Sequence, residues 1–195
     1  MARVYRAAMI VLRHCQSEFN LQFTRTRRDP GIVDPVLTGL GERQAEQAAA
    51  ALEGTPITRI LVSPYTRALQ TAVPIARARS LVPVVTPLLR ERYAFICDIG
   101  SPRSVLQSRW PELGFADLDE VWWPDAAKNG AETEGAVIDR AAFFREAMAA
   151  MADWRTTLVV SHWGFLLALS GISLENGTFR HVDPTVIPGP IVWRH

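Results

Sequence analysis

The stretch IVLRHCQSEFN, residues 10–20, decides how the rest of the chain is interpreted. Its first residues belong to an apolar run, residues 7–12, that is typical of a buried strand. Arg13 and His14 follow at the carboxyl end of that strand, where an open α/β sheet keeps its ligand crevice. A guanidinium beside an imidazole at this position indicates anion chemistry. A strand that merely ends in two polar residues would look the same, so other parts of the chain must decide.

The composition is that of a globular protein whose charge acts locally. The chain has 195 residues, of which 48% are hydrophobic and 21% charged, and its formal net charge is +1. This length suffices for a core that buries about 70% of the unfolded surface, so we expect one domain over residues 1–195. A net charge near zero gives no long-range field for nucleic acid. All basic residues except Lys128 are arginines, whose guanidinium groups bind phosphate oxygens in a fork.

The cysteines and the apolar runs indicate the compartment. Cys15 and Cys97 are far apart and form neither a metal-ligand spacing nor a disulfide framework, which is typical of a reducing environment. The apolar run at residues 7–12 is too short for a signal-peptide core or a membrane span. We therefore expect a cytoplasmic protein that interacts with no membrane. The sequence does not indicate an oligomeric state.

Strand and helix patterns alternate along the chain. Buried strands are predicted at residues 57–62, 81–85 and 156–160, and one or two edge strands after residue 176. Helices are predicted at 18–28, from a Thr38 cap to Glu53, after a Ser63 cap with Pro64 in the first turn, at 134–152 and at 165–169. This alternation predicts an α/β fold, a single-domain three-layer α/β/α sandwich with a mainly parallel sheet and an antiparallel edge strand.

Residues 92–132 lack periodicity and are rich in aromatic residues and proline. A bare loop of that length is unusual in a compact domain, so we expect short helices that form a lid or wall over the site. The aromatic side chains fit either a local core or ligand stacking. In the same way, Arg25, Arg27 and Arg28 fit either a substrate entrance or a solvated surface cluster.

Charged residues follow three more of the predicted strands. Arg67 falls in the first turn after the strand at 57–62, Glu91 follows the strand at 81–85, and His162 follows the strand at 156–160. Parallel strands end at the same edge of a sheet, so we expect these residues to meet Arg13 and His14 there. Chance explains one such residue more easily than four strand ends. The pattern therefore favours an anion site.

Five sequence blocks carry a more specific signal. They are residues 13–20 (RHCQSEFN), 34–44, 63–72, 89–91 (LRE) and 161–164 (SHWG). In this order they resemble the histidine phosphatase superfamily, also called the phosphoglycerate mutase-like proteins, whose first signature is Arg-His-Gly followed by a polar residue, Ser or Thr, and Asn. The resemblance covers about residues 8–170. Glu132 matches a Gly-Glu-Ser element of the family only loosely, and we assign it no role.

The resemblance implies a phosphatase that uses neither metal nor cofactor and hydrolyses a small phosphomonoester, as histidine acid phosphatases do. His14 is expected to attack phosphorus and form phosphohistidine. Glu91 is expected to be the general acid and then the base for water. The groups that surround the phosphate oxygens are expected to be Arg13, Arg67 and His162, with Asn20 as a neutral donor. Further substrate contacts are expected from Cys15, Gln16, Ser17 and Trp163.

Two residues depart from the family pattern. Cys15 replaces the usual glycine after the histidine, which is expected to narrow the pocket and to place a thiol beside the nucleophile. Trp163 replaces a glycine after His162 and is expected to wall the leaving-group side or stack on a ring. Three alternatives stay open: a phosphoglycerate-type mutase, a catalytically silent relative that binds phosphorylated ligands or proteins, and a redox role for Cys15.

Overall fold

The computed structural model describes residues 8–125 and 130–193. These residues form a five-stranded sheet in the order β3-β2-β4-β1-β5. The parallel strands are β1 (Met9–Arg13), β2 (Arg59–Val62), β3 (Val84–Val85) and β4 (Thr157–Ser161), and β5 (Phe179–Val182) pairs antiparallel with β1. The predicted fold class, with its mainly parallel sheet and antiparallel edge strand, is confirmed.

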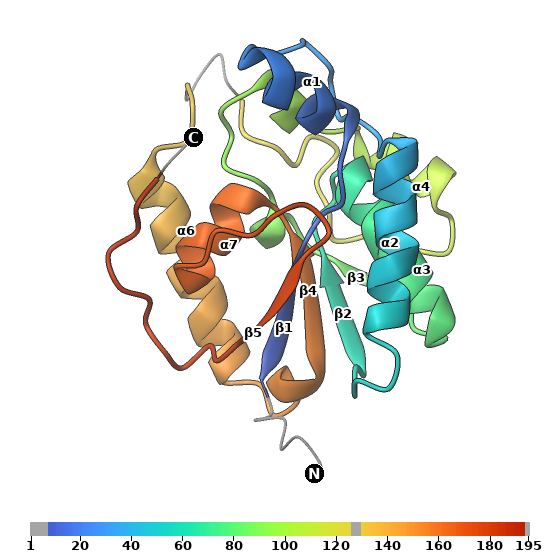
Figure 1. Ribbon diagram of the computed structural model, residues 1–195, viewed down its shortest axis with the longest axis vertical. Coiled ribbons are helices and arrows are strands. Elements are labelled where there is room, and N and C mark those ends of the chain that lie inside the picture. Colours follow the sequence, from blue (N-terminus) through green and yellow to red (C-terminus); the bar gives the residue numbers. More distant parts are fainter. Residues whose placement is uncertain (1–7, 126–129, 194–195) are drawn as a thin grey trace.

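Helices cover both faces of this sheet (Figure 1). One face carries α2 (Gly39–Ala51) and α3 (Thr66–Ala78), and the other carries α6 (Glu134–Ala149) and α7 (Trp163–Ser170). Alternate residues of β1 serve the two cores: Ile10 and Leu12 pack on the α2 and α3 side, while Met9 and Val11 pack on the other. Burial on both faces explains why this strand reads as a continuous apolar run.

The carboxyl edge of the sheet is covered by irregular chain and short helices. In Figure 1, α1 (Glu18–Thr26) lies across the end at which the parallel strands finish. The 3-10 helices η1 (Pro87–Leu89) and η2 (Ile96–Asp98) follow β3, and α4 (Arg103–Arg109) comes after them. A further 3-10 helix, η3 (Trp154–Thr156), leads into β4. Within residues 8–125 and 130–193, no helix combines the length and apolar character needed to cross a membrane.

Several element boundaries differ from the predictions. The first strand begins at Met9, and Ala7 lies outside the described residues. The strand predicted at 81–85 shrinks to two residues, because only Val84 and Val85 pair with β2. Residues 183–193, the described part of the tail, contain no second edge strand.

The prediction that Ser63 caps α3 is wrong. The helix begins at Thr66 with Tyr65 as its N-cap residue, and Pro64 precedes the first turn. Ser63 is instead fully buried, and its hydroxyl contacts His162. Ser63 therefore does not cap α3; its hydroxyl links the end of β2 to the end of β4 through His162.

The segment 92–132 divides into two parts, with residues 126–129 outside the described chain. Trp110, Phe115 and Trp122 pack into the core beside α3, which fits the local-core interpretation of these aromatics. Gly100 makes this packing possible, since a Cβ there would lie 2.2 Å from the Trp122 ring. Residues 92–98 instead run along the carboxyl edge of the sheet, where they form a wall.

Candidate active site

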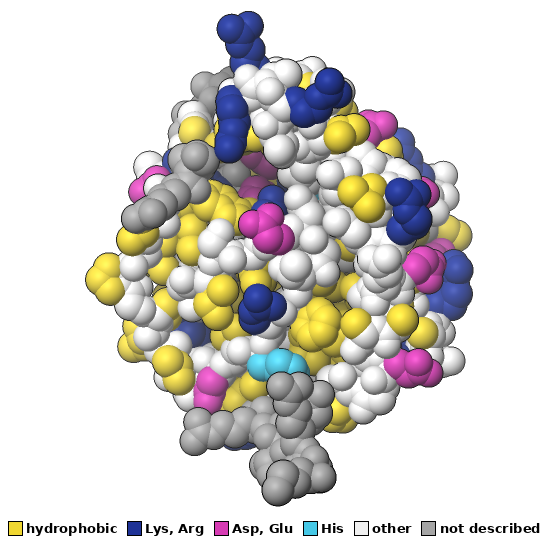
Figure 2. Space-filling view, viewed as in Figure 1, with side chains coloured by type: hydrophobic (Ala, Val, Ile, Leu, Met, Phe, Trp, Pro, Cys, Tyr) yellow, Lys and Arg dark blue, Asp and Glu magenta, His cyan; other side chains and the backbone are white. Residues whose placement is uncertain are grey.

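A cavity of about 510 Å³ opens at the carboxyl edge of the parallel strands. Figure 2 shows this face of the molecule, where acidic and basic side chains lie side by side in a hollow in the upper half of the view. The cavity is lined by six of the residues that the sequence predicted for the site: Arg13, His14, Asn20, Arg67, Glu91 and Trp163. The strand ends therefore converge on one hollow.

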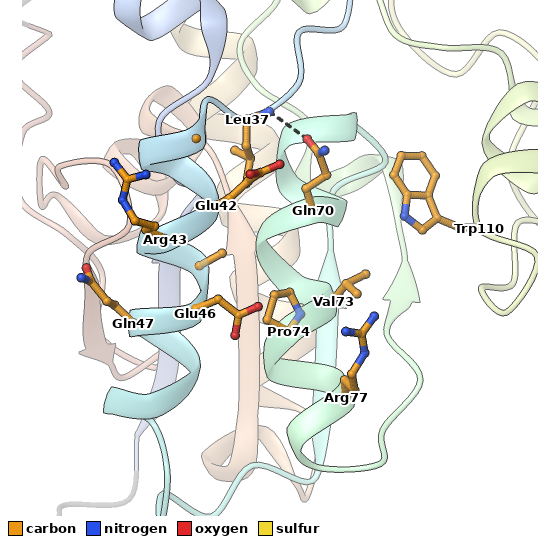
Figure 3. A pocket seen from close by; sticks show the side chains of 12 residues that line it. Leu37, Glu42, Arg43, Glu46, Gln47, Gln70, Val73, Pro74, Arg77 and Trp110 are labelled. Atoms are coloured by element: carbon orange, nitrogen blue, oxygen red, sulfur yellow. Dashed lines mark hydrogen bonds between the residues drawn. The ribbon is translucent and has the colours of Figure 1, made fainter.

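A larger hollow of about 700 Å³ lies between α2 and α3 (Figure 3). Its wall includes Gln70, whose Oε1 accepts a hydrogen bond from the Leu37 amide at 2.8 Å. None of the residues predicted for the site lines it. The predicted site residues therefore gather at the smaller cavity.

His14 is held in a single tautomer, with the proton on Nδ1. Its Nδ1 lies 2.8 Å from the Cys15 carbonyl oxygen, which can only accept, so Nδ1 carries the proton and Nε2 keeps its lone pair. The pKa of His14 lies well below its ordinary value, because burial, and then the charges of Arg67 and Arg13, disfavour the imidazolium. The ring is thus neutral at physiological pH.

The backbone around His14 is fixed by residues 174–178, which sequence reasoning did not connect with the site. Asn176 donates from Nδ2 to the His14 carbonyl at 3.0 Å, and the Gly177 amide donates to the same oxygen at 3.3 Å. The Arg13 guanidinium donates from Nη1 to the Leu174 carbonyl at 2.7 Å. This segment therefore supports both Arg13, the last residue of β1, and His14, which follows it.

His162, also predicted for the site, lies behind His14 and does not itself line the cavity. Its ring centroid is 5.0 Å from that of His14, and the side chain is fully buried. Its Nε2 lies 2.7 Å from Ser63 Oγ, while Nδ1 has no hydrogen-bond partner among the described residues. A hydroxyl and an imidazole nitrogen can each donate, so this contact fits both tautomers, and Nδ1 carries the proton in the one where the Ser63 hydroxyl donates to Nε2. Burial, and then the charge of Arg67, hold the pKa of His162 well below its ordinary value.

Arg67 is oriented by Asp98, a residue that the sequence did not single out. The guanidinium donates from Nη1 to the Cys97 carbonyl at 2.8 Å and from Nη2 to Asp98 Oδ1 at 3.1 Å. The other carboxylate oxygen accepts hydrogen bonds from the Ala94 and Phe95 amides, both at 3.0 Å. Burial raises the pKa of Asp98 to about 6, although the Arg67 charge opposes the shift. Asp98 thus fixes the Arg67 guanidinium at the cavity and partly offsets its charge.

Glu91 is fixed at the N-terminus of α7. Its Oε2 accepts from the Gly164 amide at 3.1 Å, and its Oε1 accepts from the Phe165 amide at 3.2 Å. A helix N-terminus offers such free amides to a carboxylate. Gly164 is required for this approach, because a Cβ there would lie 2.6 Å from Glu91 Oε1.

A buried ion pair supports the chain on either side of Glu91. Arg140 donates to both carboxylate oxygens of Glu132, from Nε to Oε1 at 3.1 Å and from Nη2 to Oε2 at 2.8 Å. The same guanidinium donates to the carbonyls of Leu88 at 2.9 Å, Arg90 at 2.8 Å and Glu91 at 3.3 Å. Glu132, which the sequence left unassigned, therefore helps to hold the segment that carries Glu91.

Asn20 and Ser17 divide the roles predicted for them. The Asn20 Oδ1 accepts from the Ser17 amide at 3.0 Å and from the Ser17 hydroxyl at 2.9 Å, which forms the N-terminal cap of α1. This leaves Asn20 Nδ2 as a donor for the cavity. Ser17 is buried outside the cavity lining and acts as a helix cap.

Cys15 and Gln16, predicted to contact substrate, are also absent from the cavity lining. The Cys15 side chain is fully buried with Leu37 and Ala45, and burial raises the pKa of its thiol to about 11. The expectation that this thiol narrows the pocket is wrong, because the side chain packs toward α2 instead. Gln16 also faces α2, where its Oε1 accepts from Thr38 Oγ1 at 2.9 Å.

Trp163 lines the cavity from the first residue of α7. Its Nε1 donates to Ser173 Oγ at 3.0 Å, and its ring centroid lies 5.9 Å from that of Trp193. The indole is thus held from two sides as a wall. Among the described residues, no group of three or more His, Cys, Asp or Glu side chains is arranged to hold a metal ion.

Comparison with known proteins supports a phosphoryl-transfer site. A sequence model of the histidine phosphatase superfamily (branch 1) matches residues 9–185. A glucosyl-3-phosphoglycerate phosphatase of Mycolicibacterium vanbaalenii is 30% identical over 180 residues, which are 86% of this chain and 76% of that protein. A probable phosphoglycerate mutase of Proteus mirabilis is 33% identical over 120 residues, which are 62% of this chain but 49% of that protein. A solved structure of a mycobacterial glucosyl-3-phosphoglycerate phosphatase superposes with a TM-score of 0.56 and 28% identity, covering 83% of this chain and 76% of that one.

Proposed function

Because this chain belongs to the histidine phosphatase superfamily, we propose that it is a phosphomonoesterase that works through a phosphohistidine at His14. The observation that carries the proposal is the hydrogen bond from His14 Nδ1 to the Cys15 carbonyl, which leaves Nε2 with a lone pair. Arg13, Arg67 and Glu91 line the same cavity and provide positive charge and a carboxyl group. The substrate class is a small phosphorylated molecule.

In the first step, the lone pair of His14 Nε2 forms a bond to phosphorus as the bond from phosphorus to the leaving oxygen breaks. Glu91 in its acid form gives its proton to that oxygen, so an alcohol leaves and phosphohistidine remains. Charge spreads over the equatorial oxygens in a loose transition state. Arg13, Arg67 and the Nδ1–H of His162 are the groups that stabilise this charge, and Asn20 adds a neutral donor.

In the second step, water attacks phosphorus while the Glu91 carboxylate takes one of its protons. The bond from phosphorus to Nε2 breaks, inorganic phosphate is released, and His14 returns to its neutral form. Glu91 ends the cycle protonated, ready for the next substrate. The backbone amides at the start of α7 keep the carboxyl group in one place through both steps.

The experiment that tests this function is turnover of a panel of phosphomonoesters, with and without chelator, by the parent protein and by His14→Ala. We expect turnover that chelator leaves unchanged and a loss of at least about 10³-fold in the variant. The proposal fails if the parent protein hydrolyses no ester, or if His14→Ala is as active as the parent. Acid-labile label from a ³²P-phosphoester on the parent chain identifies the intermediate.

Two alternative functions would use the same residues. A mutase must keep a second phosphate in the pocket while it excludes water, and the panel separates it by isomerisation of 3-phosphoglycerate. A silent relative would bind inorganic phosphate without turnover. The tautomer of His14 and the fixed position of Glu91 favour a working enzyme over a silent relative. The similarity to glucosyl-3-phosphoglycerate phosphatases over most of the chain favours a hydrolase over a mutase.

A further inference from the structure

The cavity extends well beyond what a phosphate group needs. Its volume of about 510 Å³ is that of a site for a whole small molecule. One face of α1 forms a side wall, with Phe19, Asn20, Phe23, Thr24 and Arg27 all lining the cavity. At a rise of about 1.5 Å per residue, the path from Asn20 to Arg27 is about 10 Å long. The wall therefore runs from the phosphate end out to the mouth.

Three phenylalanine rings form the middle of this wall. The rings of Phe19 and Phe23 stack with centroids 5.1 Å apart, and Phe95 meets them at 5.4 Å and 5.1 Å. Phe19 is 8% exposed and anchors α1. Phe23 and Phe95 remain half-buried and line the cavity, so part of each ring faces the space that a leaving group would fill. This aromatic wall (Phe19, Phe23 and Phe95) stands beside a phosphate site that is otherwise polar.

The end of the aromatic wall near Arg27 also offers surfaces that an aromatic ring of a substrate could contact. The Arg27 guanidinium lies 6.0 Å from the centroid of Phe23, a distance at which cations attract aromatic faces. Trp163 lines the same cavity from α7 and adds a further flat apolar surface. A small polar leaving group would leave these surfaces in water, whereas an aromatic ring would cover them and make offset or edge contacts.

We propose that the substrate is a phosphomonoester whose leaving group carries an aromatic ring, which Phe23 and Phe95 contact while the phosphate lies at His14. This inference rests on the proposed function and adds the class of leaving group. It makes Phe23 and Phe95 specificity-determining residues. The ring binds in the ground state and in the transition state, so the contact raises kcat/KM mainly through KM.

The test compares 2-phenylethyl phosphate with ethyl phosphate, whose leaving alcohols are of similar basicity and so make similar chemical demands. We expect the parent protein to favour the aromatic ester by at least about fivefold in kcat/KM. Phe95→Ala and Phe23→Ala should bring this ratio close to one. Phe143→Ala, on an exposed side chain of α6, is the matched control and should keep the parent ratio.

The other possible results also test the proposal of an aromatic leaving group. Phe23→Leu keeps apolar volume without the ring, so a parent-like ratio in a folded Phe23→Leu protein overturns the proposal for that residue. Turnover of ethyl phosphate that equals or exceeds that of the aromatic ester overturns the inference but leaves the proposed function intact. If no ester is hydrolysed, the proposed function fails, and the dissociation constants of benzylphosphonate and methylphosphonate on the parent protein decide whether the wall binds a ring.

Discussion

His14 and His162 lie with their ring centroids 5.0 Å apart, both buried and both surrounded by guanidinium charge. Burial and the charges of Arg67 and Arg13 lower both pKa values, and His14 further lowers that of His162. Two neutral imidazoles therefore lie side by side, one lining the cavity and the other buried behind it. In the proposed reaction the first is the nucleophile and the second a donor to the phosphate.

The lowered pKa of His14 predicts the acid side of the pH profile. A histidine with the ordinary pKa of about 6.5 is mostly protonated at pH 5.5 and would lose about tenfold in activity. Since the pKa of His14 lies well below its ordinary value, the lone pair on Nε2 persists there. We expect kcat/KM for p-nitrophenyl phosphate to change by less than about threefold between pH 7 and 5.5. A tenfold fall centred near pH 6.5 would contradict this assignment.

The pair of Asp98 and Arg67 predicts a pH-dependent anion affinity. Above pH 6 the Asp98 carboxylate offsets the Arg67 charge, and below it Asp98 is protonated, because burial raises its pKa to about 6. Inhibition by sulfate, whose charge is constant in this range, should therefore strengthen as the pH falls through 6. Asp98→Asn should bind sulfate more tightly at pH 7.5 and lose the step near pH 6. A step of parent size in this variant would show that another group titrates.

Gly164→Ala should reduce catalysis even though alanine has the higher helix propensity in α7. Alanine favours a helix interior over glycine by about 1 kcal/mol, but here its Cβ would displace Glu91 Oε1. We expect kcat for alkyl phosphates to fall by about 10²-fold, the usual contribution of a general acid. The matched control is Gly135→Ala in α6, where a Cβ meets nothing within 4 Å. Equal activity of the two variants would contradict the role of this contact.

Arg140 is a positioning residue for Glu91, and its loss should depend on the leaving group. Arg140→Gln removes the bidentate partner of Glu132, which keeps only its ion pair with Arg90, and frees the carbonyls of Arg90 and Glu91. Hydrolysis of alkyl phosphates, which need the acid, should fall by at least about tenfold more than that of p-nitrophenyl phosphate. Arg145→Gln on the same helix serves as the control. A purely structural role would lower both rates equally, and breaking a buried pair should also cost about 3 kcal/mol of unfolding free energy.

The Cys15 thiol should be inert toward electrophiles. It is fully buried and burial raises its pKa to about 11, so little thiolate exists at neutral pH. We expect neither iodoacetamide nor peroxide at pH 7.5 to inactivate the folded protein within an hour. Cys15→Ala should keep kcat/KM within about twofold and lower stability by about 1 kcal/mol through lost packing. Rapid inactivation prevented by phosphate would restore the redox hypothesis.

The sequence predicted which residues at or soon after strand ends meet in the cavity, but not which residues of irregular chain join them. Arg13, His14, Arg67 and Glu91 each lie within about six residues of a strand end, and a parallel sheet carries such residues to one edge. Asp98 lies in a segment without periodicity, so nothing in the local pattern indicates that it reaches Arg67. Its partner is 31 positions away, and only the folded chain brings them together.

The sequence pattern also did not show in which direction the side chains next to His14 point. Cys15 and Gln16 adjoin the nucleophile in sequence, yet the turn after β1 directs both toward α2. Gly41 permits this close approach, since a Cβ there would lie 2.0 Å from the Gln16 carbonyl oxygen. Neighbours in a motif thus serve either chemistry or packing, according to the local backbone.

The support that residues 174–178 give to Arg13 and His14 has a consequence for biosynthesis. Asn176 and the His14 carbonyl are 162 positions apart, so the nucleophile emerges from the ribosome long before the residues that hold it. Such distant contacts form late, because a long loop must close before they can contribute. A nascent chain that ends before Leu174 should contain every residue of the proposed catalytic set and still be inactive. The chain of residues 1–195 should be active once released, so phosphatase activity reports a fold in which residues 174–178 have reached His14.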